Sequence, residues 1–236
     1  MCLRKADLKP NRWLGEQLGN GGTVVLDTDI YDIDVSMPSG TATLDLNGHN
    51  IILTGKINVA SGASLTIQGD GMIRTTSDYA IYNDGGTVKI NGGTIKAAQA
   101  PVYQTDGAFE MSGGTLIRVG NTPSSECALQ ADSGTINIIG GTLDSGEGSS
   151  DIYITYDATV NISGGTFCKL GFHGTVVGRD NPSQVAITIT GGIFASVYSY
   201  DLDDYVDLNL YEIKQETIEE VPVCTVIAKT QNTGVN

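Results

Sequence analysis

Side chains able to act as acids, bases or charge stabilisers gather in the C-terminal half of the chain. A glycosidase needs two carboxyl groups about 5–9.5 Å apart. A lyase needs a base together with a cation or an arginine that stabilises the developing negative charge. The connections that carry these residues are too short to build the walls of a cleft. We therefore expect no catalytic site, with a polysaccharide lyase or glycosidase as the enzymatic alternative. The candidates are Asp144, Glu147, Asp151, His173, Arg179 and Asp180.

Two groups of aspartates are candidate metal ligands. The first lies in "LDTDIYDIDVS", where the acids alternate along strands and so point outward, and the second lies near the C-terminus. Neither has the glycine and the distal glutamate of an EF-hand loop. A solvated strand face and a charged turn are the favoured interpretations, and we expect no metal and no other cofactor. The residues are Asp27, Asp29, Asp32 and Asp34, and then Asp201, Asp203, Asp204 and Asp207.

Tyrosines form the candidate binding site. If their rings are exposed, they make an aromatic strip suited to stacking on sugar rings. If their rings point inward, they form a stack in the core. The alternation of polar and apolar residues is too weak here to decide between the two. The tyrosines are Tyr79, Tyr82, Tyr103, Tyr153 and Tyr156.

The elements that must position these side chains repeat one eight-residue phrase. A glycine follows a short strand pattern in each copy, and successive glycines are 21, 23, 21, 27, 24 and 27 residues apart. A period of this size indicates a repeat architecture. The copies are "LDLNGHNI" (44–51), "LTIQGDGM" (65–72), "VKINGGTI" (88–95), "FEMSGGTL" (109–116), "INIIGGTL" (136–143), "VNISGGTF" (160–167) and "ITITGGIF" (187–194).

Within each copy, the first and third positions are large and apolar and the second is polar, which predicts a strand with one buried face. The glycines that follow permit a sharp corner. A weaker strand precedes the phrase, so that Ile81, Val102, Leu129 and Tyr153 each lie seven residues before the first core position. No hairpin reverses the chain within a period. The pattern predicts an all-β fold, a parallel β-helix of roughly eight coils stacked about 4.8 Å apart. Thr94, Thr115, Thr142 and Thr166 form a file, but the glycines beside them argue against an ice-binding surface.

The two ends depart from the repeat, as the open ends of a solenoid must. Residues 1–20 predict an N-terminal cap and attachment segment, with a short helix that places Trp13, Leu14 and Leu18 over the first coil. Residues 21–195 form the β-helix, and residues 196–236 form a C-terminal cap in which "LYEIK" and "VCTVIA" pair as strands.

Composition excludes several classes of function. The net charge is −14 with scattered basic residues, which repels the phosphate backbone of nucleic acids. No apolar run approaches the roughly 18 residues needed to cross a bilayer, and no apolar segment of a secretory signal follows the basic N-terminus. The cysteines have no metal-binding spacing and are expected to be small buried residues with free thiols. They are Cys2, Cys127, Cys168 and Cys224.

The run "GNGGTVVLDTDI…TATLDLNGHNIILTGKINVASGASLTIQGDG", followed by "GGT" coils, resembles a known class of repeat regions. This class is the right-handed parallel β-helix (pectin-lyase-like) of surface proteins of gut Firmicutes and of their bacteriophages. The segment "GGIFASVYSYDLDDYVDLNLYEI" is similar to the one that closes those regions. The resemblance covers about residues 20 to 227 and implies the fold, whereas the superfamily holds lyases, glycosidases, adhesins and tailspikes.

Together, these features predict a non-enzymatic structural protein of a bacteriophage virion, as a fibre, spike or decoration subunit that contacts host-surface polysaccharide. The resemblance implies a homotrimer, a closed symmetric assembly. Its partners would be other virion proteins, attached through the N-terminal segment, with no nucleic acid and no membrane insertion. It would be assembled in the host cytoplasm and located in the virion. The alternative is a carbohydrate-binding adhesin module of a bacterial cell-surface protein.

Overall fold

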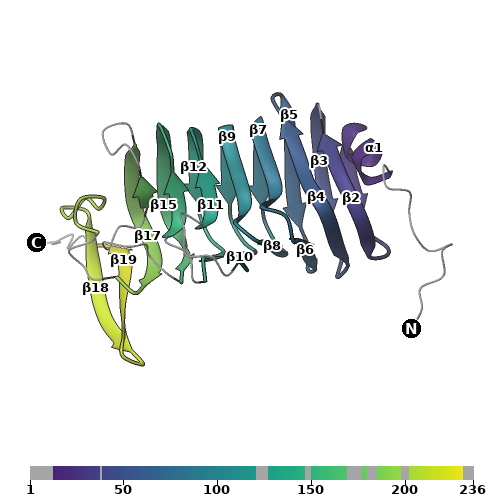
Figure 1. Cartoon of the computed structure of the whole chain (residues 1–236). Coiled ribbons are helices and arrows are strands. Elements are labelled where there is room, and N and C mark those ends of the chain that lie inside the picture. The colour runs from purple at the N-terminus through teal and green to yellow at the C-terminus, as the bar shows by residue number, and fades with distance from the viewer. Residues whose placement is uncertain are drawn as a thin grey trace, which may run out of the picture.

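The structure is a computed structural model that describes residues 13–37, 39–120, 127–146, 150–168, 177–179, 185–197 and 202–230. It is an elongated β-solenoid in which about two thirds of the described residues lie in strands. The strands lie across the long axis, the helix covers one end, and a β-hairpin extends from the other (Figure 1). The predicted parallel β-helix is confirmed.

The chain winds about six full turns. This is fewer than the roughly eight coils that the repeat predicts, because the segments at the two ends form caps rather than full coils. The elements are α1 (Trp13–Gly19), β1 (Gly22–Val25), β2 (Ile30–Met37), β3 (Gly40–Asp45), β4 (Asn50–Ala60), β5 (Ala63–Gln68), β6 (Met72–Thr75), β7 (Tyr79–Ile90), β8 (Thr94–Ala97), β9 (Ala100–Met111), β10 (Thr115–Arg118), β11 (Cys127–Ala131), β12 (Gly134–Ile138), β13 (Thr142–Asp144), β14 (Ser150–Ile154), β15 (Ala158–Phe167), β16 (Val177–Arg179), β17 (Ala186–Ala195), β18 (Tyr211–Ile218) and β19 (Val221–Ala228).

Inward-facing files of apolar side chains make the core, because each coil presents the same buried face to the next. Burying one such side chain is worth about 1.5–3 kcal/mol relative to leaving it exposed. At the C-terminal end of one file, the rings of Phe167 and Phe194 stack with centroids 4.8 Å apart. That file runs through Ile30, Ile51, Ile73, Ile95, Leu116, Leu143, Phe167 and Phe194, all at most 4% exposed.

The register of the first repeat differs from the one that the glycines predict. Leu44 pairs with Ile67, two residues beyond the predicted partner Leu65, which pairs instead with Ala42. A shift of two residues leaves every side chain on its own face, so the alternation cannot reveal it. From Leu65 onward the predicted register is confirmed, through Val88, Phe109, Ile136, Val160 and Ile187.

The weaker strand carries a second correction. Ile152, not Tyr153, pairs with the buried Leu129, and Tyr153 pairs with Gln130 on the outward face. Ile152 lies eight residues before Val160, whereas Leu129 lies seven before Ile136, so the later corner has one additional residue. A slip of one residue moves a side chain to the other face. Tyr153 therefore lies outside the core.

The doubled glycine of the repeat meets two different requirements, as Gly113 and Gly114 show. A Cβ on Gly113 would lie 2.5 Å from the carbonyl oxygen of Asn91 on the preceding coil, so this position has no room for a side chain. Gly114 has a φ of +76°, which L-residues rarely adopt. One glycine thus lets the coils approach, and the other lets the chain turn.

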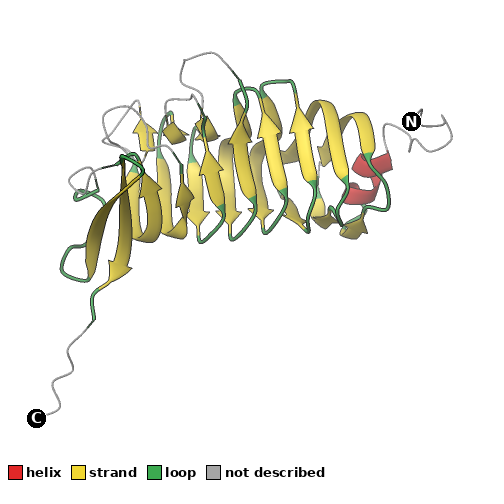
Figure 2. Cartoon of the chain, turned by 90° about the horizontal axis from the view of Figure 1, so that it is seen from below, coloured by secondary structure: helices red, strands yellow, loops and turns green. Residues whose placement is uncertain are grey.

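The ends of the solenoid are closed as predicted. Leu14 and Leu18 of α1 are buried, so the helix is packed onto the solenoid, while Trp13 packs against the core at the edge. The attachment role of this segment stays a prediction, and residues 1–12 lie outside the described residues. At the far end, β19 pairs antiparallel with both β17 and β18, which confirms the predicted strand pair (Figure 2).

Three of the four cysteines fall in the described part of the chain, and all three are free thiols. Cys127 and Cys224 are buried, as predicted for small apolar residues, but Cys168 is exposed because it follows the end of β15. Cys2 lies outside the described residues. In that same described part, no helix is both long and apolar enough to cross a membrane.

Candidate functional site

A file of large polar and aromatic side chains runs along the outward face of one sheet. Tyr82 of β7 pairs in register with Tyr103 of β9, and Tyr103 pairs with Gln130 of β11. Both tyrosines are half-buried, whereas the residues that precede them, Ile81 and Val102, are fully buried. The structure therefore decides what the alternation left open. These rings lie on the surface.

The Tyr103 ring contacts two tyrosine rings of the preceding coil. Tyr79 and Tyr103 have ring centroids 4.7 Å apart with the planes tilted by 33°. Tyr82 meets Tyr103 edge to face, with centroids 5.3 Å apart. Pairs of this kind are worth about 0.5–1.5 kcal/mol beyond the area that they bury. Tyr79, Tyr82 and Tyr103 thus form one preorganised cluster, which we call the tyrosine surface.

Charged neighbours hold two of these rings in place. The Tyr103 hydroxyl donates a hydrogen bond of 2.6 Å to Oδ2 of Asp132. Partial burial, followed by this hydrogen bond, raises the pKa of Tyr103, so its hydroxyl stays protonated across the physiological range. The Lys56 ammonium lies 3.7 Å from the centroid of the Tyr82 ring, within the range of a cation–π interaction. The tyrosine surface is therefore rigid and has polar edges.

The structure brings together three of the five predicted tyrosines. Tyr153 belongs to the same outward file but is separated from Tyr103 by Gln130. Tyr156 follows β14 and is 59% exposed. The sequence showed no sign of Lys56 or Asp132, because each reaches the surface from another coil and only the register of the coils places it there.

Of the six candidate catalytic residues, the structure describes the side chains of Asp144 and Asp151. Asp151 is fully buried, and its Oδ1 accepts a hydrogen bond of 2.9 Å from the backbone nitrogen of Ser145. Asp144 accepts one of 2.9 Å from the nitrogen of Gly146. Both carboxylates therefore cap backbone turns. Glu147, His173, Asp180 and the side chain of Arg179 lie outside the described residues.

Arg118 is a buried charge that the sequence did not indicate. Its side chain is 3% exposed and contacts the carbonyl of Ser145. Burial raises the pKa of the neighbouring Cys127 thiol, the Asp151 carboxylate adds to the rise, and Arg118 opposes it. Arg118, Asp151 and Cys127 thus lie close together inside the solenoid.

The acidic groups interact with the protein itself. Asp29 accepts hydrogen bonds from the backbone nitrogen of Asn50 at 2.8 Å and from the hydroxyl of Tyr31 at 3.2 Å, and the former is the main reason that its pKa is lowered. Asp207 caps the nitrogen of Asn209. Asp201 and the side chain of Asp32 lie outside the described residues. Among the described side chains, no three His, Cys, Asp or Glu residues are placed to hold a metal ion.

Comparison with known proteins adds no family. No protein-family model, no curated protein and no solved structure matches this chain.

Proposed function

We propose that the protein is a non-enzymatic structural and binding protein, a fibre or spike subunit of a bacteriophage virion that contacts carbohydrate through the tyrosine surface. The observation that carries the binding role is the preorganised cluster of Tyr79, Tyr82 and Tyr103, which lies outward on neighbouring coils. The virion role is supported by the resemblance of the repeat to phage and surface β-helix regions.

Rigidity makes this cluster suitable for binding sugars. Its rings are already packed, so little side-chain entropy is lost when a ligand arrives. Aromatic faces contact the apolar faces of sugar rings, while the hydroxyls and the Asp132 carboxylate can bond to the sugar hydroxyls at the edges. Because the tyrosines sit on stacked coils, a glycan chain can contact more than one ring.

Binding is tested by screening the full chain on immobilised bacterial-surface glycans and then titrating the best ligand. We expect Tyr82→Ala to weaken binding by roughly tenfold, which corresponds to about 1.4 kcal/mol. Tyr156→Ala is the matched control, because it removes an exposed tyrosine outside the cluster, and its affinity should equal that of the wild type. The binding role is wrong if Tyr82→Ala and Tyr156→Ala bind with equal affinity while circular dichroism shows both folded.

The virion role is tested by light scattering of the full chain over a range of concentrations. A stable trimer is the expected result, since fibres of this kind are closed symmetric assemblies. A monomer at every concentration would contradict the fibre subunit. With glycan binding intact, the monomer would favour the adhesin module, whose single copy displays the same tyrosines.

A further inference from the structure

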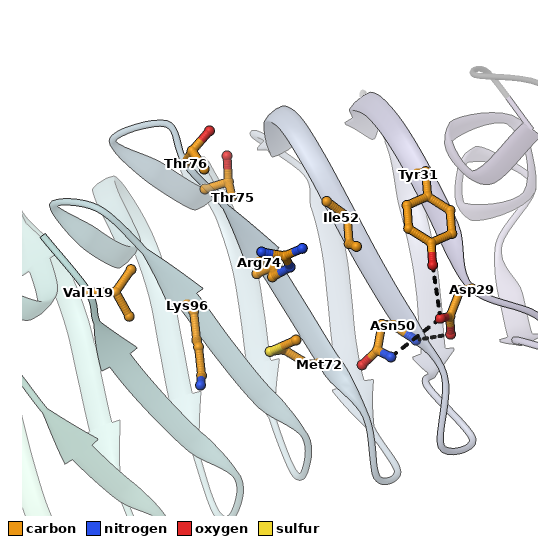
Figure 3. A pocket seen from close by; sticks show the side chains of 10 residues that line it. All are labelled: Asp29, Tyr31, Asn50, Ile52, Met72, Arg74, Thr75, Thr76, Lys96 and Val119. Atoms are coloured by element: carbon orange, nitrogen blue, oxygen red, sulfur yellow. Dashed lines mark hydrogen bonds between the residues drawn. The ribbon is translucent and has the colours of Figure 1, made fainter. Parts of the chain in front are cut away.

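A groove of about 450 Å³ lies on a different face of the solenoid from the tyrosine surface. It crosses the outward faces of β2, β4, β6 and β8 and reaches the end of β10 (Figure 3). Tyr31, Asp29 and Asn50 gather at one end, and Arg74 and Lys96 project farther along (Figure 3). We call it the cationic groove.

Two positive charges lie side by side in this groove without an acidic partner. Arg74 of β6 and Lys96 of β8 are paired in register on neighbouring strands. Like charges directly opposite each other on a sheet are destabilising. Within the described part of the chain, neither has a carboxylate within 4.0 Å, although acidic residues outnumber basic ones by 27 to 13.

The other basic side chains that the structure describes are differently placed. Lys89 forms an ion pair with Glu110 at 3.2 Å, and Lys214 forms one with Glu212 at 3.4 Å. Lys56 lies over the Tyr82 ring, and Lys229 donates to the carbonyl of Leu208. Arg118 is buried against Ser145. Two neighbouring cations without an acidic partner are therefore a local exception in an acidic protein.

The rest of the groove is suited to a hydroxylated molecule. Half-buried apolar side chains of Ile52 and Met72 line it between its two ends. At the end opposite the cations, the Asp29 carboxylate has its charge stabilised by the backbone nitrogen of Asn50 and by the Tyr31 hydroxyl. The Asn50 side-chain nitrogen lies 3.5 Å from Oδ2 of Asp29 and His49 Nδ1 lies 3.6 Å from Oδ1, and both contacts are long enough for a ligand hydroxyl to replace one of them at the carboxylate.

We propose that the cationic groove binds a hydroxylated ligand that carries a phosphate ester, with the ester group between Arg74 and Lys96 and a hydroxyl donating to Asp29. A phosphate ester carries about −1.5 to −2 charges and three acceptor oxygens at pH 7. The planar Arg74 guanidinium can bond to two oxygens while the Lys96 ammonium acts as a point charge. A carboxylate, with one charge, would compensate only one of the two cations.

The test is calorimetric titration of the full chain with glucose 6-phosphate, glucose 6-sulfate, glucuronate, glucose and inorganic phosphate. We expect glucose 6-phosphate to bind more tightly than the monoanions glucose 6-sulfate and glucuronate, and its affinity to fall by about tenfold in Arg74→Gln and in Lys96→Gln, a loss of one charge-assisted contact. Lys89→Gln is the matched control. It makes the same change of charge outside the groove, at an existing ion pair, and should leave the ester affinity unchanged.

Several results would overturn this assignment. Equal weakening by Lys89→Gln would show that overall charge, and not the groove, attracts the ester. Glucuronate binding as tightly as the phosphate ester would contradict the preference for a divalent oxyanion, and inorganic phosphate doing so would contradict the hydroxylated ligand. Absence of ester binding would reject the site. Tyr82→Ala should not change the ester affinity, so failure here is distinct from failure of the tyrosine surface.

A second readout needs no ligand. If the two cations repel each other, Arg74→Gln should raise the midpoint of thermal unfolding of the free protein, whereas Lys89→Gln should lower it by removing an ion pair. Equal midpoints for Arg74→Gln and the wild type at low salt would contradict an uncompensated pair.

Discussion

Replacing Gly107 with alanine adds a methyl group where two coils touch through their backbones. The new Cβ would lie 2.2 Å from the carbonyl oxygen of Gly86 and 2.8 Å from the carbonyl carbon of Gly85, at a φ of +91°. The positive φ costs an L-residue roughly 1–2 kcal/mol, and a methyl group forced into filled space costs about 1–3 kcal/mol. Alanine also restricts the unfolded chain, which offsets roughly 0.4–1 kcal/mol. The net loss should be about 2–4 kcal/mol.

Two matched variants separate the two costs. Gly62 has a φ of +81° and no atom within 4 Å of its Cβ position, so Gly62→Ala measures the backbone conformation alone and should cost about 1 kcal/mol. Gly113 has no positive φ, but its Cβ would lie 2.5 Å from the oxygen of Asn91. Gly113→Ala therefore measures the contact between coils alone, and a loss of about 0.5–2.5 kcal/mol is expected after the same offset from the unfolded chain.

The assay is urea unfolding of the three variants and the wild type, followed by circular dichroism. The midpoint should fall while the slope stays the same, which is the sign of a change in stability alone. In thermal unfolding, each kcal/mol shifts the midpoint of a domain of this size by about 2–4 °C. If Gly107→Ala loses no more stability than Gly62→Ala, the coils can separate freely at this corner and the steric reasoning is refuted.

Three further outcomes are expected. Asn83→Ala should cost about 2–3 kcal/mol in urea unfolding, because the buried Asn83 amide bonds to Gln104 Oε1 and to the nitrogen of Gly86, which would both lose a partner; a stability equal to wild type would contradict this. Changing Glu219 and Glu220 to Asn-Gly should stabilise the protein by about 1 kcal/mol in thermal unfolding, because both residues have positive φ (49° and 69°) in a two-residue hairpin turn; a lower midpoint would contradict this. Although the Cys168 residue is exposed, its thiol is partly desolvated, and this raises the pKa of Cys168 to about 11, with Asp144 and Asp151 adding to the rise. Its thiolate fraction at pH 8 should be roughly a hundredfold below that of a thiol with a pKa of 9, so alkylation of Cys168 should be correspondingly slow and increase about tenfold per pH unit up to pH 10; a rate that levels off below pH 9 would contradict the shift.

The repeated phrase by itself determined the fold. Apolar residues at alternate positions, followed by glycine at intervals of 21 to 27 residues, require every coil to bury the same face against its neighbours. The doubled glycine also indicated a corner, and the loss of the pattern at both ends located the caps. Because these signals concern each strand and its own flanks, they can be read without knowing which coil lies beside which.

Only the tertiary structure shows which residues of neighbouring coils lie side by side. The pairing of Leu44 with Ile67 is invisible to a pattern of period two, and the outward position of Tyr153 depends on one residue in a corner. Arg74 and Lys96 are 22 residues apart in the chain, yet the register sets them directly opposite each other. The pattern within each strand determines whether a side chain points inward or outward. The lengths of the corners determine which outward side chains of neighbouring coils lie next to each other, and so where the candidate sites form.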